Sequence, residues 1–426
     1  MSKRIFKRMI VLFLLLLIAI YLIPASKSDF FKQYKQRDIA SESLREFQSR
    51  STKQINIDGI NWTYYRGGKG DKTLVFLHGM GGAYDLWWQQ ILFFEKEYQV
   101  ISYTLPEEIT SLDAATKGIT AILDKERITH FNAVGTSMGG YILQYLLQRM
   151  PQRIDKAVLS NTFPPNNIIK DENRLKEKII PYLPKFILSK LALKQVNNKL
   201  VPAAHNSQLL AAFLPSLPFS KRQFMNRYAV VIDVFNADTN NYQLTRIPKM
   251  IMESDNDPLV AKVLREQLKN LYADATVFTF HNEGHFPYIS DADTYNLVLS
   301  GFLSKDNPYQ QVERVIKRYF KSRKEADVLA LKSVFTANAT LHTIRDNQLV
   351  NISLDDYLKH VASVGEQTVQ TTIIDGKTQG KIAQFSTQFQ YADKTYIDYL
   401  NLVKVQDNWQ IIEKTFYKIK SAMTPH

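Results

Sequence analysis

Short, mainly apolar segments typical of strands alternate with longer amphipathic stretches between residues 55 and 304. These segments are four or five residues long, which is typical of strands buried on both faces of a parallel sheet. They occupy residues 73–77, 100–103, 131–134, 156–160, 249–252 and 276–279. The stretches that predict helices are 111–125, 137–150, 259–271 and 290–303. An Asp-Gly dipeptide within the alternating residues 55–66 predicts a β-hairpin ahead of the first of these segments. This order predicts an α/β fold, a parallel sheet with helices on both faces.

Two further blocks do not follow that rhythm. Residues 162–245 are spaced by prolines and rich in helix-forming residues, which predicts a helical insertion in the α/β domain. The sequence Asp-Asn-Pro at 306–308 then opens a second domain over residues 306–426. An amphipathic helix comes first, with apolar residues at Val312, Val315, Ile316, Tyr319 and Phe320. Alternating stretches follow at 340–344, 371–374, 382–391, 395–405 and 409–418. Helices followed by a long antiparallel meander predict an α+β domain.

The N-terminus combines a basic cluster with an apolar run. Residues Met9 to Ile23 are apolar without interruption, and four basic residues precede them, at positions 3, 4, 7 and 8. This pattern is typical of an uncleaved transmembrane anchor or, with the small residues at 24–26, of a cleaved signal peptide. We expect residues 1–26 to form a transmembrane helix and residues 27–54 a polar linker. Residues 25–426 would then be extracytoplasmic, as in a bacterial periplasm, and cleavage would give a secreted protein.

Composition and charge exclude several kinds of site and partner. The chain has 426 residues, of which 45% are hydrophobic, a formal net charge of +13 and no cysteine. Disulfide bridges, thiolate metal sites, iron–sulfur clusters and a cysteine nucleophile are therefore excluded. Residues 162–245 hold 11 Lys/Arg against 5 Asp/Glu, spread among Leu, Phe and Pro. Nucleic-acid binders concentrate basic residues on one element. We therefore expect no nucleic acid as a partner and a nearby membrane surface, with a merely solvated basic face as the alternative.

Two glycine-rich turns directly follow predicted strands. The segment Gly135–Gly139 (GTSMG) lies between a strand and a helix, the setting in which G-x-S-x-G exposes a nucleophilic serine. Backbone N–H groups at the start of that helix point at developing negative charge. The second turn, His78–Gly82 (HGMGG), follows the first core strand. We expect Ser137 to be the nucleophile and the backbone N–H groups of Met80 and Met138 to form an oxyanion hole.

A nucleophilic serine needs a base, and the base needs a group that orients it. The polar turn after the strand at 249–252 offers two carboxylates. Asp257, directly before Pro-Leu-Val, is our choice, and Asp255 is the alternative. The expected base is His285, in a loop after the last core strand, with the nearby His281 as its alternative. The order serine, aspartate, histidine along the chain is one of the known orders of a hydrolytic triad.

Residues 55–304 resemble the α/β-hydrolase superfamily. The matching motifs are HGMGG at 78–82, GTSMG at 135–139, SDNDPLV at 254–260 and GHFPY at 284–288. The resemblance implies a mostly parallel eight-stranded sheet, with the site at its carboxyl edge and residues 162–245 as a helical cap over that site. Because a serine stands at position 137, the dehalogenase and epoxide-hydrolase branches, which place an aspartate there, are disfavoured.

One stretch departs from the common pattern of that superfamily. After the strand at 99–103, many members carry D-x-x-G-x-G-x-S, whereas this chain reads YTLPEEI at 103–109. That departure, together with Leu271-Tyr272 and the GHFPY motif, resembles the maspardin-like branch, which is associated with protein binding as much as with catalysis. Ser137, an acid candidate and His285 are all retained, so the enzyme interpretation comes first.

Residues 307–420 resemble the nuclear-transport-factor-like cone fold, close to its lumazine-binding group. The matching residues occupy core and turn positions: Tyr319-Phe320, Asp327, Val334-Phe335, Asp398-Tyr399-Leu400 and Trp409-Gln410-Ile411-Ile412. The resemblance implies a concave pocket, which such folds use for ligands, dimers or catalysis. We find no acid–base pair in this domain and interpret His342 and His360 as structural. A homodimer contact or a ligand site is the expected role.

The sequence therefore predicts a membrane-anchored serine hydrolase that cleaves a carboxylic ester, either a small molecule or lipid-like. Ser137, His285 and Asp257 would carry the reaction, with no cofactor and no metal ion, since a base and an oxyanion hole suffice. The apolar residues of the cap would exclude water and hold an acyl group. The alternative is a non-catalytic adaptor that binds a protein or ligand on a hydrolase scaffold.

Overall fold

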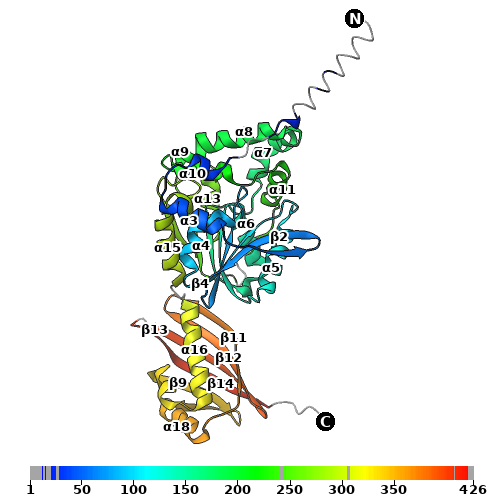
Figure 1. Cartoon of the computed structure of the whole chain (residues 1–426). Coiled ribbons are helices and arrows are strands. Elements are labelled where there is room, and N and C mark those ends of the chain that lie inside the picture. The colour runs from blue at the N-terminus through cyan, green and yellow to red at the C-terminus, as the bar shows by residue number, and fades with distance from the viewer. Residues whose placement is uncertain are drawn as a thin grey trace. The chain divides into compact units, whose positions relative to one another are not determined.

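Eight strands and six strands form two separate sheets, one in each of the two units into which the chain divides. The units are residues 1–303 and residues 304–426. Figure 1 shows the computed structural model of the protein. It describes residues 12, 15, 21–24, 28–238, 244, 246–304, 308–406 and 408–420.

The transmembrane helix predicted within residues 1–26 is not supported. Among the residues that the structure describes, no helix is both long enough and apolar enough to cross a membrane. The apolar run from Met9 to Ile23 has 15 residues. Of this run the structure describes Leu12, Leu15 and residues 21–23, and the other positions lie outside the described residues.

The polar linker predicted over residues 27–54 is also wrong, because part of this segment packs into the first unit. It contains helices α2 (Phe30–Gln33) and α3 (Ile39–Gln48). Phe30 and Phe47 are 4% and 0% exposed, and they belong to the core cluster that includes residues of α4 (Trp88–Phe94). These apolar residues are few and separated by charged ones, so the amphipathic pattern is masked in a segment of polar average composition.

The sheet of the first unit confirms the expected mostly parallel arrangement of eight strands. Its strands are β1 (Lys53–Ile57), β2 (Ile60–Gly67), β3 (Lys72–Leu77), β4 (Tyr98–Thr104), β5 (Phe131–Thr136), β6 (Ile154–Ser160), β7 (Lys249–Ser254) and β8 (Thr276–Phe280). Their spatial order is β1-β2-β4-β3-β5-β6-β7-β8. Strands β1 and β2 form the antiparallel hairpin, and β3 to β8 run parallel. Because parallel strands end at one edge, the loops after β3, β5, β7 and β8 meet there.

Helices cover both faces of this sheet, and alternate residues of each strand point to opposite faces. In β3, Val75 and Leu77 join the core under α5 (Leu112–Lys125), α6 (Met138–Arg149) and α13 (Lys262–Leu271). Leu74 and Phe76 join the core under α3, α4 and α15 (Ala292–Ser304). This explains why the central strands appear in the sequence as continuous apolar runs instead of alternating ones.

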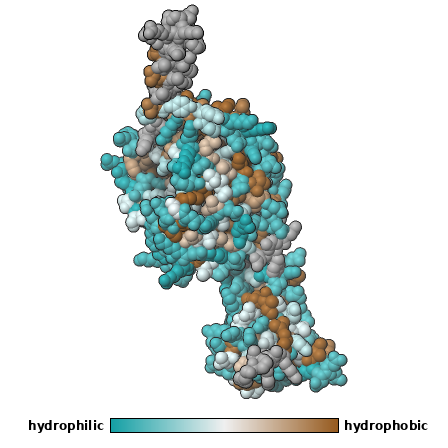
Figure 2. Space-filling model, turned by 90° about the vertical axis from the view of Figure 1, so that its right-hand side faces the viewer, coloured by the Kyte–Doolittle hydropathy of each residue, from teal (hydrophilic) through white to brown (hydrophobic). Residues whose placement is uncertain are grey.

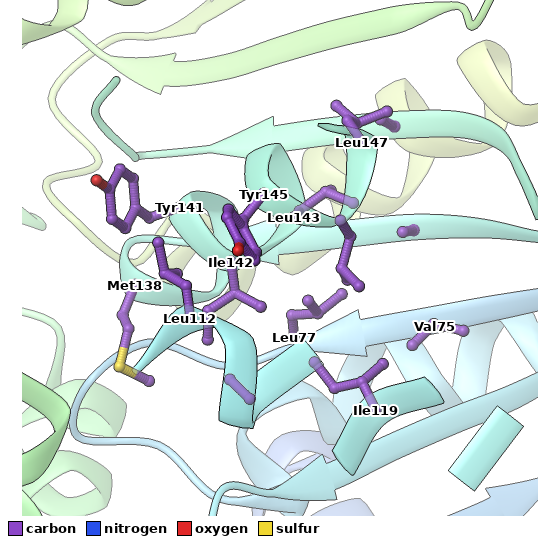
Figure 3. Packing of buried hydrophobic residues seen from close by; sticks show 14 of the residues in the cluster. Val75, Leu77, Leu112, Ile119, Met138, Tyr141, Ile142, Leu143, Tyr145 and Leu147 are labelled. Atoms are coloured by element: carbon purple, nitrogen blue, oxygen red, sulfur yellow. The ribbon is translucent and has the colours of Figure 1, made fainter. Parts of the chain in front are cut away.

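Helix α6, which begins directly after Ser137, is the most deeply embedded helix of this layer. Ten of its 12 residues are buried. Figure 3 shows Ile142 and Leu143 of α6 lying around Leu77 of β3, with Leu112 and Ile119 of α5 beside them. A helix held this firmly fixes the position of the residue at its N-terminus.

The predicted cap leaves the sheet after β6 and returns at β7. Its elements are α7 (Ile168–Ile179), η3 (Ile180–Tyr182), α8 (Lys185–Gln195), η4 (Val196–Leu200), α9 (Val201–Ala203), α10 (Gln208–Phe213), η5 (Leu214–Ser216) and α11 (Lys221–Val231). Helix α7 has no buried residue, whereas α10 and α11 bury Leu210, Phe213, Arg227 and Val230. The cap therefore has an exposed part and an embedded part. On the face of the first unit in Figure 2, the surface is mostly hydrophilic with separate hydrophobic patches.

The second unit is the α+β domain that the sequence predicts. Its helices are α16 (Pro308–Glu325), α17 (Val328–Ser333) and α18 (Leu354–Val364). Its strands are β9 (Phe335–Arg345), β10 (Gln348–Ser353), β11 (Gln370–Gln379), β12 (Ile382–Gln390), β13 (Lys394–Val405) and β14 (Asn408–Lys420), in the order β10-β9-β14-β13-β12-β11. All neighbours are antiparallel except β9 and β14. The core gathers Val312, Ile316 and Tyr319 of α16 against Leu400 and Trp409.

Candidate active site

Ser137 stands in a sharp turn between β5 and α6. Its backbone angles are φ 53° and ψ −120°, a conformation that costs a residue with a side chain on the order of 1–3 kcal/mol. The neighbouring strand supports the turn, because the Ser137 N–H donates to the carbonyl of Ser160 at 3.0 Å and the Thr162 hydroxyl donates to the Ser137 carbonyl at 2.6 Å. A Cβ at Gly135 would lie 2.4 Å from the carbonyl oxygen of Gly139. The G-x-S-x-G spacing is thus required by the close approach of the backbone.

Asp257 and His285 form a buried pair at the carboxyl edge of the sheet. The His285 Nδ1 atom lies 2.8 and 3.0 Å from the two carboxylate oxygens of Asp257, and the residues are 3% and 8% exposed. Asn161 donates to the same carboxylate at 3.0 Å, and the N–H groups of Leu259 and Val260 donate at 2.8 and 3.1 Å. Burial alone would raise the pKa of Asp257, but His285 and these hydrogen bonds outweigh it and hold the pKa below its ordinary value. The carboxylate is therefore charged and fixed in place.

The two alternatives pair with each other instead. His281 Nδ1 lies 2.8 Å from the carboxylate of Asp255, and their side chains are 79% and 43% exposed. The Asn282 N–H and His281 lower the pKa of Asp255. Solvent screens the charges of an exposed pair, so this pair has little influence on Ser137. The geometry therefore separates a buried pair, Asp257 with His285, from a surface pair, Asp255 with His281.

The HGMGG turn is stabilised by hydrogen bonds of its own histidine, His78. The Leu105 N–H donates to Nε2 of His78 at 2.9 Å, so Nδ1 carries the proton and donates to the Gly79 carbonyl at 2.7 Å. Burial, with the nearby charge of Arg227, lowers the pKa of His78 to about 3. His78 is thus neutral at ordinary pH and serves as a structural brace, since both ring nitrogens are occupied.

A second brace comes from helix α11 of the cap. Arg227 is 0% exposed and donates to the carbonyls of Met80 and Gly82, each at 2.8 Å, and of Leu105 at 2.7 Å. No sequence pattern predicts this role for Arg227, because its three partners lie 122 to 147 positions away along the chain. The same reason applies to Asn161, the donor to Asp257, and no local motif marks either residue.

An apolar cavity of about 240 Å³ joins these elements. Ser137, His285 and residues Gly79–Gly82 of the HGMGG turn line its wall. The cap contributes mainly apolar side chains, among them Val196, Leu200, Leu214, Leu217, Phe219 and Phe224. The cavity thus brings together the predicted nucleophile, the predicted base and the Met80 part of the predicted oxyanion hole. Asp257 lies behind His285, and Met138 begins α6 with its side chain fully buried.

The second unit contains a buried charged cluster that no sequence motif predicts. Lys414 of β14 donates to Asp398 of β13 at 2.8 Å and to the hydroxyl of Tyr319 at 2.6 Å, and Tyr319 donates to Asp398 at 2.7 Å. The three residues are 5%, 1% and 0% exposed. Each of the three residues lies in a different element, so no regular spacing in the sequence indicates that they form a cluster.

Within the described residues, no group of three or more His, Asp or Glu side chains could hold a metal ion.

Family models match both units. The model described as "alpha/beta hydrolase fold" matches residues 72–292, just over half of the 426 residues. The chain belongs to the alpha/beta hydrolase fold family. A second model, described as "Putative lumazine-binding", matches residues 307–417. The resemblances drawn from the sequence motifs are thereby confirmed for this hydrolase and its C-terminal domain.

Curated relatives of this alpha/beta hydrolase include enzymes. A strigolactone esterase of Pisum sativum is 26% identical over 52% of this chain and 89% of that protein. A 3-oxoadipate enol-lactonase of Acinetobacter baylyi is 30% identical over 25% of this chain and 44% of that protein. Maspardin of Mus musculus is 23% identical over 56% of this chain and 78% of that protein. The esterase and lactonase relatives support a hydrolase, and the maspardin match agrees with the departure noted at residues 103–109.

Solved structures confirm the fold of the first unit. A hydrolase from Pseudomonas aeruginosa superposes with a TM-score of 0.53 at 19% identity, covering 60% of this chain and 100% of that one. An enol-lactonase from Burkholderia xenovorans superposes with a TM-score of 0.51 at 16% identity, covering 59% of this chain and 100% of that one. At these identities the likeness establishes the fold alone.

Proposed function

We propose that this alpha/beta hydrolase is a serine hydrolase that cleaves a carboxylic ester with an apolar acyl group. One observation carries the proposal: the buried Asp257–His285 pair and Ser137 adjoin the same apolar cavity. Burying a carboxylate beside an imidazole costs desolvation free energy. Such buried pairs are common at active sites, where the carboxylate orients the imidazole as a catalytic base. The esterase and lactonase relatives support the same reaction class.

The residues suit a two-step mechanism. Because Nδ1 of His285 is bound to Asp257, Nε2 is the nitrogen that takes the hydroxyl proton of Ser137. The serine oxygen attacks the ester carbonyl, and the resulting oxyanion accepts hydrogen bonds from the N–H groups of Met80 and Met138. His285 returns the proton to the leaving alkoxide, and an alcohol departs. Water, activated by His285, then releases the acid and frees Ser137.

The cavity favours an apolar acyl group over a charged one. Its cap-side wall is mainly Leu, Val and Phe, and Gln195 and Gln223 are the polar side chains that the cap adds. An apolar wall stabilises a bound acyl chain by roughly 25 cal/mol per Å² removed from water. A volume of about 240 Å³ suits a short or medium chain better than a long one.

A series of p-nitrophenyl esters of increasing acyl length tests the proposal. We expect kcat/KM to rise from acetate to a short or medium chain and then to fall, and to be abolished in Ser137→Ala. His281→Ala is the matched control, since this exposed histidine should leave turnover unchanged. Absence of hydrolysis by the folded wild-type protein would contradict the proposal and favour a binding protein on a hydrolase scaffold.

A further inference from the structure

We propose that Arg227 is a positioning residue that couples the cap to the oxyanion hole. The inference rests on the proposed function, because it concerns the same site. Arg227 lies on α11, in the embedded part of the cap, and all its hydrogen bonds go to the loops that shape the floor of the cavity. It contacts no reacting group and would act through the backbone of the HGMGG turn.

The bonds of Arg227 fix three points of the site at once. Nη1 donates to the carbonyls of Met80 and Gly82, on either side of the tip of the turn, and Nη2 donates to the carbonyl of Leu105. Three carbonyls held by one planar guanidinium allow the turn little freedom to rotate. The Met80 N–H, which the proposed mechanism aims at the oxyanion, belongs to the preceding peptide unit, whose Gly79 carbonyl is bound by His78. Arg227 holds the peptide unit directly after it and so limits the rotation of the Met80 backbone from the other side.

Among the described residues, Arg227 forms no ion pair with Asp or Glu, which argues against a purely structural salt bridge. The residue is 0% exposed, and Glu107 acts on its guanidinium only from a distance. Burial lowers the pKa of Arg227 to about 10, so the group keeps its charge at neutral pH. An unpaired buried charge is costly. Beside a turn that is to stabilise an oxyanion, its positive field favours the transition state.

Helix α11 also lines the substrate cavity. Gln223 and Phe224 lie in the cavity wall, one turn before Arg227 on the same helix. The start of the helix is tied to the body of the unit by Ser220, which donates to the Glu107 carboxylate at 2.6 Å. Asn226 donates to the Glu107 carbonyl at 2.7 Å. A substrate that contacts Gln223 and Phe224 thus contacts helix α11, the helix whose Arg227 binds the HGMGG turn.

The sequence departure at residues 103–109 fits this role. Leu105 and Glu107, which bind Arg227 and the start of α11, both belong to the YTLPEEI stretch that replaces the common D-x-x-G-x-G-x-S pattern. In this chain, the stretch after β4 is therefore where the cap is attached to the oxyanion turn. We infer that Arg227 and this stretch function as one unit.

The test compares Arg227→Ala and Arg227→Lys with the wild type in the full chain, using a p-nitrophenyl ester. We expect kcat to fall about 10²-fold in Arg227→Ala, the size of effect known for the loss of one oxyanion donor, with KM nearly unchanged. Added guanidinium ion, at a concentration below the denaturing range, should restore part of kcat. Arg227→Lys should also lower kcat, because an ammonium cannot span three carbonyls. Arg174→Ala, at an exposed position of α7 in the same cap, is the matched control and should keep full activity.

Several outcomes would overturn the inference. If the wild type is active and a folded Arg227→Ala variant has the same kcat, the inference is wrong. The proposed function would then still hold. A loss of kcat that tracks a loss of Tm, without rescue by guanidinium, would assign Arg227 a structural role only. If Arg227→Ala does not fold, Arg227→Lys decides by the same comparison of kcat with KM. A folded but inactive wild type would overturn both the inference and the proposed function.

Discussion

At the scale of single residues, two carboxylates two positions apart have different surroundings. Asp255 and Asp257 both follow β7, and the sequence alone leaves both open as the acid. The structure places Asp257 among four donors and 8% exposed, whereas Asp255 binds the exposed His281. The environment that stabilises a buried carboxylate is what orients His285.

Asp257→Asn should therefore lower kcat by several orders of magnitude, as the equivalent change does in a serine protease, by about 10⁴-fold. The amide cannot hold His285 in the tautomer that the proposed mechanism needs. Asp255→Asn should change kcat less than about threefold, since an exposed ion pair contributes little. Steady-state ester hydrolysis by the two variants measures this, and the reverse ranking would transfer the orienting role to Asp255.

Acid should remove the contribution of Asp257 to stability. Its pKa in the folded protein lies below its ordinary value, so its stabilisation is fully present above the unfolded pKa of about 3.9 and is lost as pH falls through the folded pKa. We expect the free energy of unfolding to fall more steeply below about pH 4 in the wild type than in Asp257→Asn. Denaturant titrations at a series of pH values would show parallel curves if the carboxylate contributed nothing.

At the scale of elements, the sequence predicts strands and helices whose apolar pattern is continuous. It does not predict a helix whose few apolar residues are separated by polar ones. Strand β3 carries the unbroken apolar run Leu74–Leu77, so its position follows directly from the sequence. In α3 the buried residues Leu44 and Phe47 stand between polar and charged ones, so the sequence pattern predicts a linker where the structure has a helix. The turns of the site were predictable because G-x-S-x-G and HGMGG are local, whereas Asn161 and Arg227 reach their partners only through the fold.

The packing of α3 can be tested directly. Phe47→Ala should destabilise the first unit by about 3–5 kcal/mol, because a fully buried ring is replaced by a cavity. Ile39→Ala is the control, since Ile39 lies on the same helix and is 87% exposed, and it should cost less than about 0.5 kcal/mol. Denaturant unfolding followed by tryptophan fluorescence gives both values. Equal stability of the two variants would mean that the segment is a linker after all.

At the scale of the whole molecule, the chain couples a hydrolase unit to a unit with its own buried polar core. The second unit holds Lys414 and Asp398 in its interior, and Lys414 Nζ lies 4.8 to 6.0 Å from the centres of four aromatic rings. Burial would lower the pKa of Lys414, but Asp398 outweighs it and raises the pKa. The pair therefore contributes stability below the unfolded lysine pKa of about 10.4, and this is lost as pH rises through the folded value.

Lys414→Met should destabilise the second unit by about 3–5 kcal/mol, because it leaves a buried carboxylate without its partner. The double variant Lys414→Met with Asp398→Leu should be more stable than the single one, since no charge remains buried. Hydrogen exchange of peptides from residues 394–420 isolates this unit. Lys359→Met, at an exposed ion pair of α18, is the control. A single variant as stable as that control would contradict the expectation.

The most direct test of the central claim is covalent labelling with a fluorophosphonate probe, followed by mass spectrometry of the modified peptide. Ser137, if activated by His285 and Asp257, should carry the whole adduct in the wild-type protein. Labelling should be lost in Ser137→Ala and in His285→Ala, and the double variant should be no worse than either single one, because the residues act as a unit. Labelling that persists in Ser137→Ala, or a folded wild-type protein that takes up no probe, would contradict the assignment of Ser137 as an activated nucleophile.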